Sequence, residues 1–127
     1  MQERRLSARY RCRCPAAVQG PNSEYRDMEI REVSLTGLTL WVRREVVLAL
    51  AQAGSILTLG DRIHVSSRGA GVEDGAPEVA LPCRVQHVRR LSQDRYQVGT
   101  RFEVLDPRQL EVLEQWVARA QGGHGSR

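Results

Sequence analysis

Much of this sequence alternates between apolar and polar residues with a period of two, and the alternation limits the folds open to the chain. The clearest examples are Asp27–Val33 and Leu38–Val42, where Leu38, Leu40 and Val42 fall on one face. Period-two alternation is typical of β-strands that bury one face. The pattern therefore predicts a protein built mainly from β-strands.

Further segments show the same alternation, with turn-like residues between them. They are residues 10–18, 61–67, 79–85 and 96–104. About six short antiparallel strands are thus expected, and six strands with one apolar face each close naturally into a small barrel. The predicted fold class is an all-β-dominated, six-stranded antiparallel β-barrel.

A different period begins at Asp106-Pro107. Asp106 is a good helix N-cap and Pro107 a good first helical residue, and apolar residues then recur at three- and four-residue spacing. Those apolar residues are Leu110, Leu113, Trp116 and Val117. We therefore expect a helix over residues 107–120 that packs on the barrel through this face and ends at Gly122-Gly123.

The chain is predicted to form one domain with two flanking segments. Residues 1–9 are polar and basic and are expected to form a flexible arm. Residues 10–120 are expected to form the barrel and its helix, and residues 121–127 a disordered tail. Residues 44–53 fit either a short helix ended by Gly54 or a strand followed by a loop.

Composition narrows the possible compartments and functions. The N-terminus lacks the apolar core of a signal peptide, and no apolar run approaches the roughly 20 residues of a membrane helix. A soluble, cytoplasmic protein without membrane insertion is therefore expected. Three cysteines, Cys12, Cys14 and Cys83, form no zinc-binding pattern, and the simplest interpretation is buried or half-buried thiols.

Arginine supplies all of the basic residues, 19 in number, and the formal net charge is +4. Arginine binds phosphates and guanine edges in a bidentate manner. An anionic ligand therefore suits the composition, although so mild a charge does not require nucleic acid. A high-GC genome is an alternative explanation for the absence of lysine.

The stretch from Glu32 to Gly37 combines several groups that could bind a ligand at a predicted turn. Glu32 is a hydrogen-bond acceptor, and Ser34 and Thr36 carry hydroxyls. Gly37 permits a positive φ and a close approach of a ligand to the backbone. The alternative interpretation is an ordinary hairpin with polar turn residues.

In context, this stretch resembles the second motif of the PilZ domain family. That family carries an RxxxR motif, often extended to RRxxxR, followed by (D/N)xSxxG. Here Arg4-Arg5-x-x-x-Arg9 leads into a strand, and Glu32-x-Ser34-x-x-Gly37 follows between two later strands. The resemblance covers roughly residues 4–118, including a late Gly-x-x-Phe strand and the closing helix. It implies a six-stranded barrel and a bacterial receptor for cyclic di-GMP.

The resemblance also assigns roles to matching positions. Arg5 and Arg9 match the arginines of the family's flexible arm, which fold onto the ligand, and Arg4 matches the additional arginine, which leaves a bound ligand dimer open. Ser34 and Gly37 match the serine and glycine of the second motif. No cofactor or metal is implied, and the ligand and an unknown downstream protein are the expected partners.

Glu32 departs from the family pattern, which has aspartate or asparagine there. Glutamate keeps a carboxylate that can accept from guanine N1–H and N2–H, but its additional methylene moves the acceptor by more than about an ångström, which a hydrogen bond tolerates poorly. Two outcomes remain open. Either Glu32 folds back to reach the base, or the strand is displaced to suit the longer side chain.

His87 fills a position where many family members have an aromatic residue that stacks on a base. A histidine can stack or donate a hydrogen bond there, and the alternative is a polar strand residue without a ligand contact. His87 is thus a further candidate ligand-binding residue.

Four function classes are considered. The first is a second-messenger receptor, and the second is a degenerate PilZ domain that acts as a protein-interaction adaptor, for example in motility. A nucleic-acid-binding barrel is disfavoured because the strand region holds only one tryptophan and one phenylalanine, Trp41 and Phe102, too few for an evident stacking platform. An enzyme is the least favoured class, because Ser34 has no patterned His or Asp partners.

Overall fold

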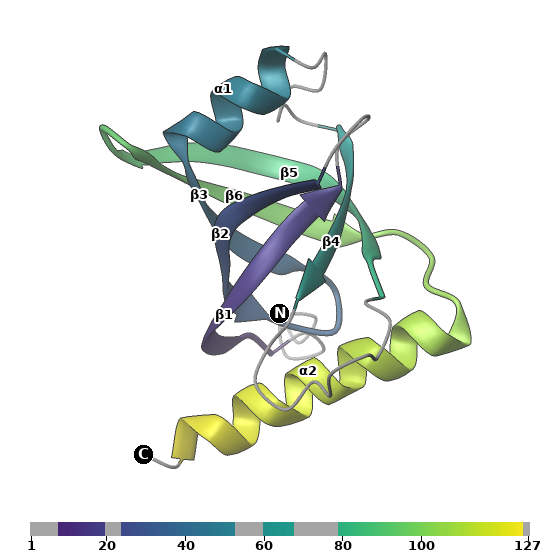
Figure 1. Cartoon of the computed structure of the whole chain (residues 1–127). Coiled ribbons are helices and arrows are strands. Elements are labelled where there is room, and N and C mark those ends of the chain that lie inside the picture. Colours follow the sequence, from purple (N-terminus) through teal and green to yellow (C-terminus); the bar gives the residue numbers. More distant parts are fainter. Residues whose placement is uncertain (1–7, 20–23, 53–59, 68–78, 126–127) are drawn as a thin grey trace.

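The computed structural model describes residues 8–19, 24–52, 60–67 and 79–125 (Figure 1). Its strands are β1 (Tyr10–Gln19), β2 (Glu24–Val33), β3 (Leu38–Arg43), β4 (Arg62–Ser67), β5 (Leu81–Ser92) and β6 (Arg95–Phe102). Two helices accompany them, α1 (Arg44–Gln52) and α2 (Pro107–Gly125). The expected arm falls almost entirely on residues 1–7, which lie outside the described residues, as does Gly54.

The strands form a closed antiparallel barrel in the order β1-β2-β3-β6-β5-β4, and the pairing of β1 with β4 completes the ring. This confirms the predicted fold class. The alternating apolar side chains point into the barrel, and Leu40, Val65, Leu81 and Val98 are completely buried there. Burial of such side chains stabilises a fold by about 1.5–3 kcal/mol each, and this is the main force that holds the barrel together.

The helical interpretation of residues 44–53 is the correct one. α1 follows β3 without a break and lies at one end of the barrel in Figure 1. Its Val46 is buried and belongs to the same apolar core as the strands. Val47 is partly buried and packs against the same core, so two valines hold this short helix on the sheet.

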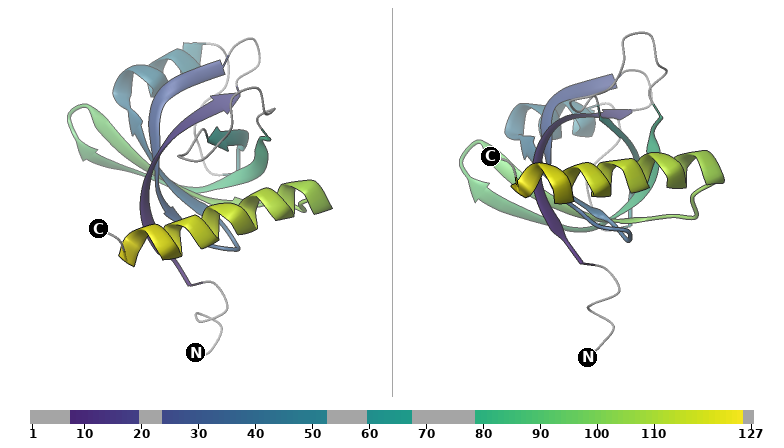
Figure 2. Two further views of the ribbon diagram at one scale, coloured as in Figure 1. Left: turned by 60° about the horizontal axis from the view of Figure 1, so that its bottom comes forward. Right: turned by 90° about the horizontal axis from the view of Figure 1, so that it is seen from below.

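α2 lies across the other end of the barrel, as both views in Figure 2 show. Its start is fixed as predicted: the Asp106 carboxylate accepts the Gln109 N–H at 2.7 Å, and the Gln109 side chain accepts the Asp106 N–H at 2.9 Å. This reciprocal arrangement is a capping box. The helix packs on the barrel through Leu113 and Val117, which are buried, and through the half-buried Trp116.

Two details of the predicted helix are wrong. Leu110 is 42% exposed and does not join the packed face, which begins at Leu113. The helix also passes Gly122 and ends at Gly125. Glycine in a helix costs only about 1 kcal/mol relative to alanine, so a glycine pair need not stop a helix that has already formed.

We predict that Leu113→Ala lowers the free energy of unfolding by about 2–5 kcal/mol, since it removes a completely buried side chain from the helix–barrel interface. Leu110→Ala is the matched control and should change stability by less than about 0.5 kcal/mol. Urea denaturation of both variants measures the difference. Similar losses in the two would contradict this packing of α2.

Candidate functional site

The turn between β2 and β3 is built around the hydroxyl of Ser34. This oxygen accepts the backbone N–H groups of Thr36 and Gly37, both at 3.1 Å, and lies 3.2 Å from the Gly37 carbonyl oxygen. The Ser34 N–H also donates to that carbonyl, at 3.0 Å. Only 2% of Ser34 is exposed. The serine therefore shapes the turn itself.

Gly37 is needed because the turn lies against β6. A β-carbon at this position would lie 2.0 Å from the Thr100 carbonyl oxygen, far inside contact distance. The described glycine with a positive φ is Gly60, so Gly37 does not use the positive φ that glycine permits. The close neighbour of Gly37 is the backbone of β6.

Further bonds tie the turn to β6. The Phe102 N–H donates to the Thr36 carbonyl at 2.8 Å. The Thr100 hydroxyl accepts the Leu38 N–H at 3.2 Å and lies 3.1 Å from the Leu38 carbonyl oxygen, to which it can donate. The turn is thus held at both of its ends, which fixes the position of the neighbouring Glu32.

Glu32 and His87 lie in one row of residues that crosses the outer face of the barrel. Glu32 pairs with Thr39, Thr39 with Gly99, and Gly99 with His87. Adjacent strands are about 4.8 Å apart, so this row of four residues spans about 14 Å. The structure therefore places the acid of the turn and the candidate stacking residue on one surface.

The His87 side chain folds over the middle of this row. A β-carbon added at Gly99 would meet the His87 ring at 2.1–2.6 Å, so the ring occupies the space directly above the glycine. His87 nevertheless remains exposed. Its ring can thus offer a face to a planar group above the barrel.

Arg9 comes to the opposite end of the row. Its guanidinium Nη1 lies 3.4 Å from Oε1 of Glu32, and the same oxygen accepts the Thr39 hydroxyl at 3.2 Å. The Arg9 side chain is 62% exposed. An ion pair so exposed contributes at most about 1 kcal/mol, so an anion can readily replace Glu32 as the partner of Arg9.

Of the site residues expected from the sequence, the structure thus brings Arg9 and Glu32 into contact and places His87 on the same face. Ser34 and Gly37 lie in the adjoining turn with inward-directed roles. Arg4 and Arg5 lie outside the described residues.

A second group on this face was not expected as a site. The Trp41 ring has the Arg31 guanidinium 3.7 Å and the Arg95 guanidinium 5.1 Å from its centroid. Trp41 is two residues from Thr39 on β3 and so faces outward like it. Both contacts are cation–π interactions. The outward position of a tryptophan between arginine-bearing strands is the signal that could have identified this cluster.

Two other findings bear on the chemistry of the described residues. No group of three His, Cys, Asp or Glu side chains among them is arranged to hold a metal ion. None of the helices in that same part of the chain is long and apolar enough to cross a membrane.

Comparison with protein families gives a match to the PilZ domain over residues 3–119. Comparison with curated protein sequences gives no match. PilZ domains are non-catalytic receptor and adaptor domains, and the family is one of c-di-GMP receptors.

Solved structures with the same fold include the inhibitor of motility MotI/DgrA of Bacillus subtilis, with a TM-score of 0.66, 14% identity, and coverage of 98% of this chain and 53% of that one. The PilZ domain of Escherichia coli YcgR with c-di-GMP has a TM-score of 0.58 and 13% identity, and the match covers 94% of this chain and 98% of that one. The K. pneumonia MrkH–c-di-GMP complex has a TM-score of 0.57 and 15% identity, and the match covers 89% of this chain and 50% of that one. The chain thus spans about half the length of MotI/DgrA and MrkH.

We predict that Ser34→Ala destabilises the fold by about 1–3 kcal/mol, because it leaves two backbone N–H groups of the turn without their acceptor. Thr36→Ala is the control: its exposed hydroxyl contacts only that of Ser34 among the described residues, and its loss should cost less than about 0.5 kcal/mol. Thermal or urea unfolding distinguishes the two. Equal stability of Ser34→Ala and the parent would show that the hydroxyl does not hold the turn.

Proposed function

This chain belongs to the PilZ domain family, and we propose that it is a cytoplasmic, non-catalytic receptor for cyclic di-GMP. The ligand would lie on the outer face of β2, β3, β6 and β5, with Arg9 and Glu32 at one end and His87 at the other. The observation that carries this proposal is the contact between Arg9 and Glu32, because it joins the two family motifs in space.

The chemistry of the ligand suits these residues. Cyclic di-GMP carries two negative phosphates and two guanines, and guanidinium groups bind both phosphate oxygens and the O6 and N7 atoms of guanine. Arg4, Arg5 and Arg9 would supply these contacts. Glu32 would accept from guanine N1–H and N2–H, and His87 would stack on a base.

Ser34 and Gly37 are retained in the proposed site as residues that shape it. Their hydroxyl and backbone contacts fix the turn beside Glu32, so a ligand would meet the outer surface of this turn. We propose that the backbone of the turn between Ser34 and Gly37, whose central residues Leu35 and Thr36 are exposed, contributes to ligand contacts.

Binding would order the basic arm and so produce a signal. Ordering several residues costs a few kcal/mol, and hydrogen bonds to charged groups return about 1.5–3 kcal/mol each. Two or three arginine contacts therefore offset the cost. The docked arm would then present a new surface to a downstream protein partner, as in pathways that regulate motility or biofilm formation.

The second candidate function is a degenerate PilZ domain that binds a protein and no nucleotide. The internal contacts of the candidate site favour it. In this structure Arg9 is paired with Glu32, and the Ser34 hydroxyl is hydrogen-bonded within the turn. In this alternative, the internal contacts replace those that a ligand would make.

We predict that the protein binds cyclic di-GMP and that Arg9→Ala weakens binding by at least about 2 kcal/mol, or more than tenfold, through loss of charge-assisted hydrogen bonds. Arg5→Ala/Arg9→Ala should bind more weakly still. Arg108→Ala, an exposed arginine on α2, is the matched control and should bind like the parent. Calorimetric titration measures the affinity and counts the ligands bound.

The outcomes of this titration separate the two candidate functions. Unchanged affinity in the double variant would show that the arm is not the site. A parent protein that releases or absorbs no heat and shows no ligand-dependent change in melting temperature would favour the adaptor. Folding should be intact in Arg9→Ala and Arg108→Ala, because both of these side chains are exposed.

We predict that Glu32→Asp tightens binding by up to about tenfold. The shorter side chain withdraws from Arg9, which frees the guanidinium for the ligand, and it presents the carboxylate at the reach of the family's aspartate. Glu32→Ala should weaken binding, because it removes the acceptor altogether. Weaker binding by Glu32→Asp would indicate a strand adapted to glutamate, and equal affinity in all three proteins would show that Glu32 does not contact the ligand.

A further inference from the structure

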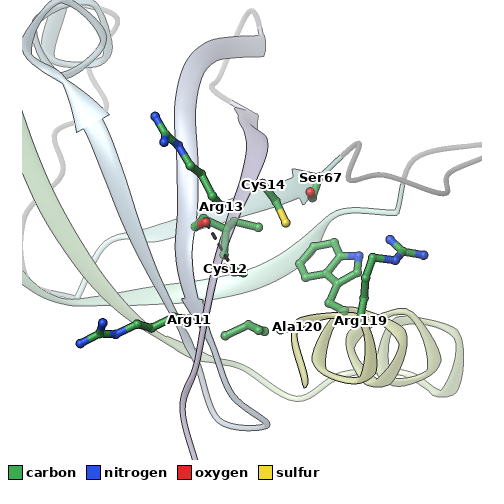
Figure 3. Close-up of a pocket in the computed structure, with 10 residues that line it drawn as sticks. Arg11, Cys12, Arg13, Cys14, Ser67, Arg119 and Ala120 are labelled. Carbon is green, nitrogen blue, oxygen red and sulfur yellow. Dashed lines mark hydrogen bonds between the residues drawn. The ribbon is translucent and has the colours of Figure 1, made fainter. Parts of the chain in front are cut away.

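A pocket of about 360 Å³ lies between α2 and the strands β1 and β2 (Figure 3), and neither Glu32 nor His87 lines it. Its apolar wall consists of Ile30, Val33, Trp116 and Ala120. Two cysteines of β1, Cys12 and Cys14, complete the wall. The pocket is large enough for a small organic molecule and lacks any role in the proposed nucleotide site.

The two cysteine side chains lie on the same face of β1 and are both free and half-buried. The Cys12 thiol donates to the Ile30 carbonyl oxygen at 3.5 Å. In Figure 3 the Cys14 sulfur points to the side on which Ser67 and Arg119 lie, whereas Arg11 and Arg13 point away from that side. Cys14 is thus the thiol that a molecule in the pocket would meet.

The surroundings of Cys14 favour its thiolate. The hydrogen bond from Cys12 is the main cause that lowers the pKa of the Cys14 thiol, to about 6, and the backbone of Arg13 and the charge of Arg119 on α2 act in the same direction. Burial and Glu29 on β2 oppose them. The same hydrogen bond and burial raise the pKa of Cys12, so the shared proton stays on Cys12.

We propose that this pocket is a site of reversible thiol oxidation, in which Cys14 is the nucleophile, Cys12 the resolving thiol and a small organic hydroperoxide the oxidant. The pairing of a thiolate with a neighbouring thiol is the arrangement found in redox-sensitive proteins. The apolar wall suits the organic part of the hydroperoxide, which hydrogen peroxide lacks. The proposal does not depend on nucleotide binding.

The reaction balances in two steps. The Cys14 thiolate attacks the terminal oxygen of ROOH, an S–O bond forms, the O–O bond breaks, and the alkoxide leaves and takes a proton from water to give ROH. The Cys12 thiol then attacks the sulfenic acid, a disulfide forms, and water leaves. Two thiols are oxidised by two electrons, and the hydroperoxide is reduced to the alcohol.

The strand geometry makes the disulfide strained and therefore reversible. Cysteines two residues apart in a strand have α-carbons about 6.6 Å apart, near the upper limit for a disulfide. The pairing of β1 with β2 shifts register between Arg11 and Cys14, so this part of the strand is irregular and can adjust. Strained disulfides are easily reduced, which would let cellular thiols restore the pair.

The experiment uses the full chain, reduced and then exposed to one equivalent of cumene hydroperoxide. Intact mass and peptide mapping should show a loss of two hydrogens and a Cys12–Cys14 disulfide, reversed by dithiothreitol. Cys83 is the internal control: it is fully buried, and burial raises the pKa of its thiol to about 12, so it should remain reduced.

Three variants test the roles assigned to the two cysteines and to the apolar wall. Cys12→Ser should stop at a sulfenic acid on Cys14, which dimedone captures, and Cys14→Ser should lose the fast reaction. Trp116→Leu should lower the rate with cumene hydroperoxide relative to that with hydrogen peroxide. Attack on the hydroperoxide by Cys12 instead of Cys14 would overturn the proposal, as would a reaction rate in Cys14→Ser equal to that of the parent.

The pH dependence gives a readout that accessibility alone would not produce. With a pKa of about 6, the thiolate fraction of Cys14 falls about tenfold between pH 7 and pH 5, whereas that of an ordinary thiol falls about a hundredfold. The groups that face Cys14 are Cys12 on its own strand, Glu29 on β2 and Arg119 on α2. A hundredfold fall in the rate would also overturn the proposal.

Discussion

The contact between Gly37 and the Thr100 carbonyl fixes the position of the β2–β3 turn on the barrel. Because no β-carbon intervenes, the turn can lie directly on β6 and exchange hydrogen bonds with it. The Ser34 hydroxyl then closes the turn from within. These two small residues, which first suggest ligand contacts, thus determine where the larger side chains of the surface stand, and Glu32 owes its place above Thr39 to them.

The fold was predictable from the sequence because each strand carries one apolar face, and only a closed or covered sheet can bury six such faces. The start of α2 was equally predictable, since Asp106 and Gln109 act through local contacts. The exposure of Leu110 was not, because periodicity identifies a helical face but not the point at which the barrel begins to cover it. Similarly, the sequence shows only that Gly122 is a weak helix former. The helical turns that precede Gly122 are already formed, and the helix continues through it.

The candidate site was predictable in its residues but not in its contacts. Motif order marked Arg9, Glu32 and His87, yet their common row depends on the register of four strands, and irregular pairings interrupt that register between Ile30 and Glu32 and between Val85 and His87. The inward direction of Ser34 depends likewise on tertiary packing. The sequence shows that the side chain of Glu32 is longer than that of aspartate, but only the structure shows what it contacts. Glu32 reaches both Thr39 and Arg9, and it can compete with a ligand for the arginine.

The closed ring of strands has a consequence for any protein that recognises this domain. Each described strand has a hydrogen-bonded neighbour on both sides, whereas β-augmentation requires a sheet edge with unpaired main-chain groups. Where the ring is closed, a partner therefore has no free edge to which it could add a strand. Among the described strands, the part of β5 beyond Val85 pairs with β6 alone and keeps one edge open. Around the rest of the ring, recognition must use side chains, on the outer face or on the helices, and the closed part is protected from edge-to-edge aggregation.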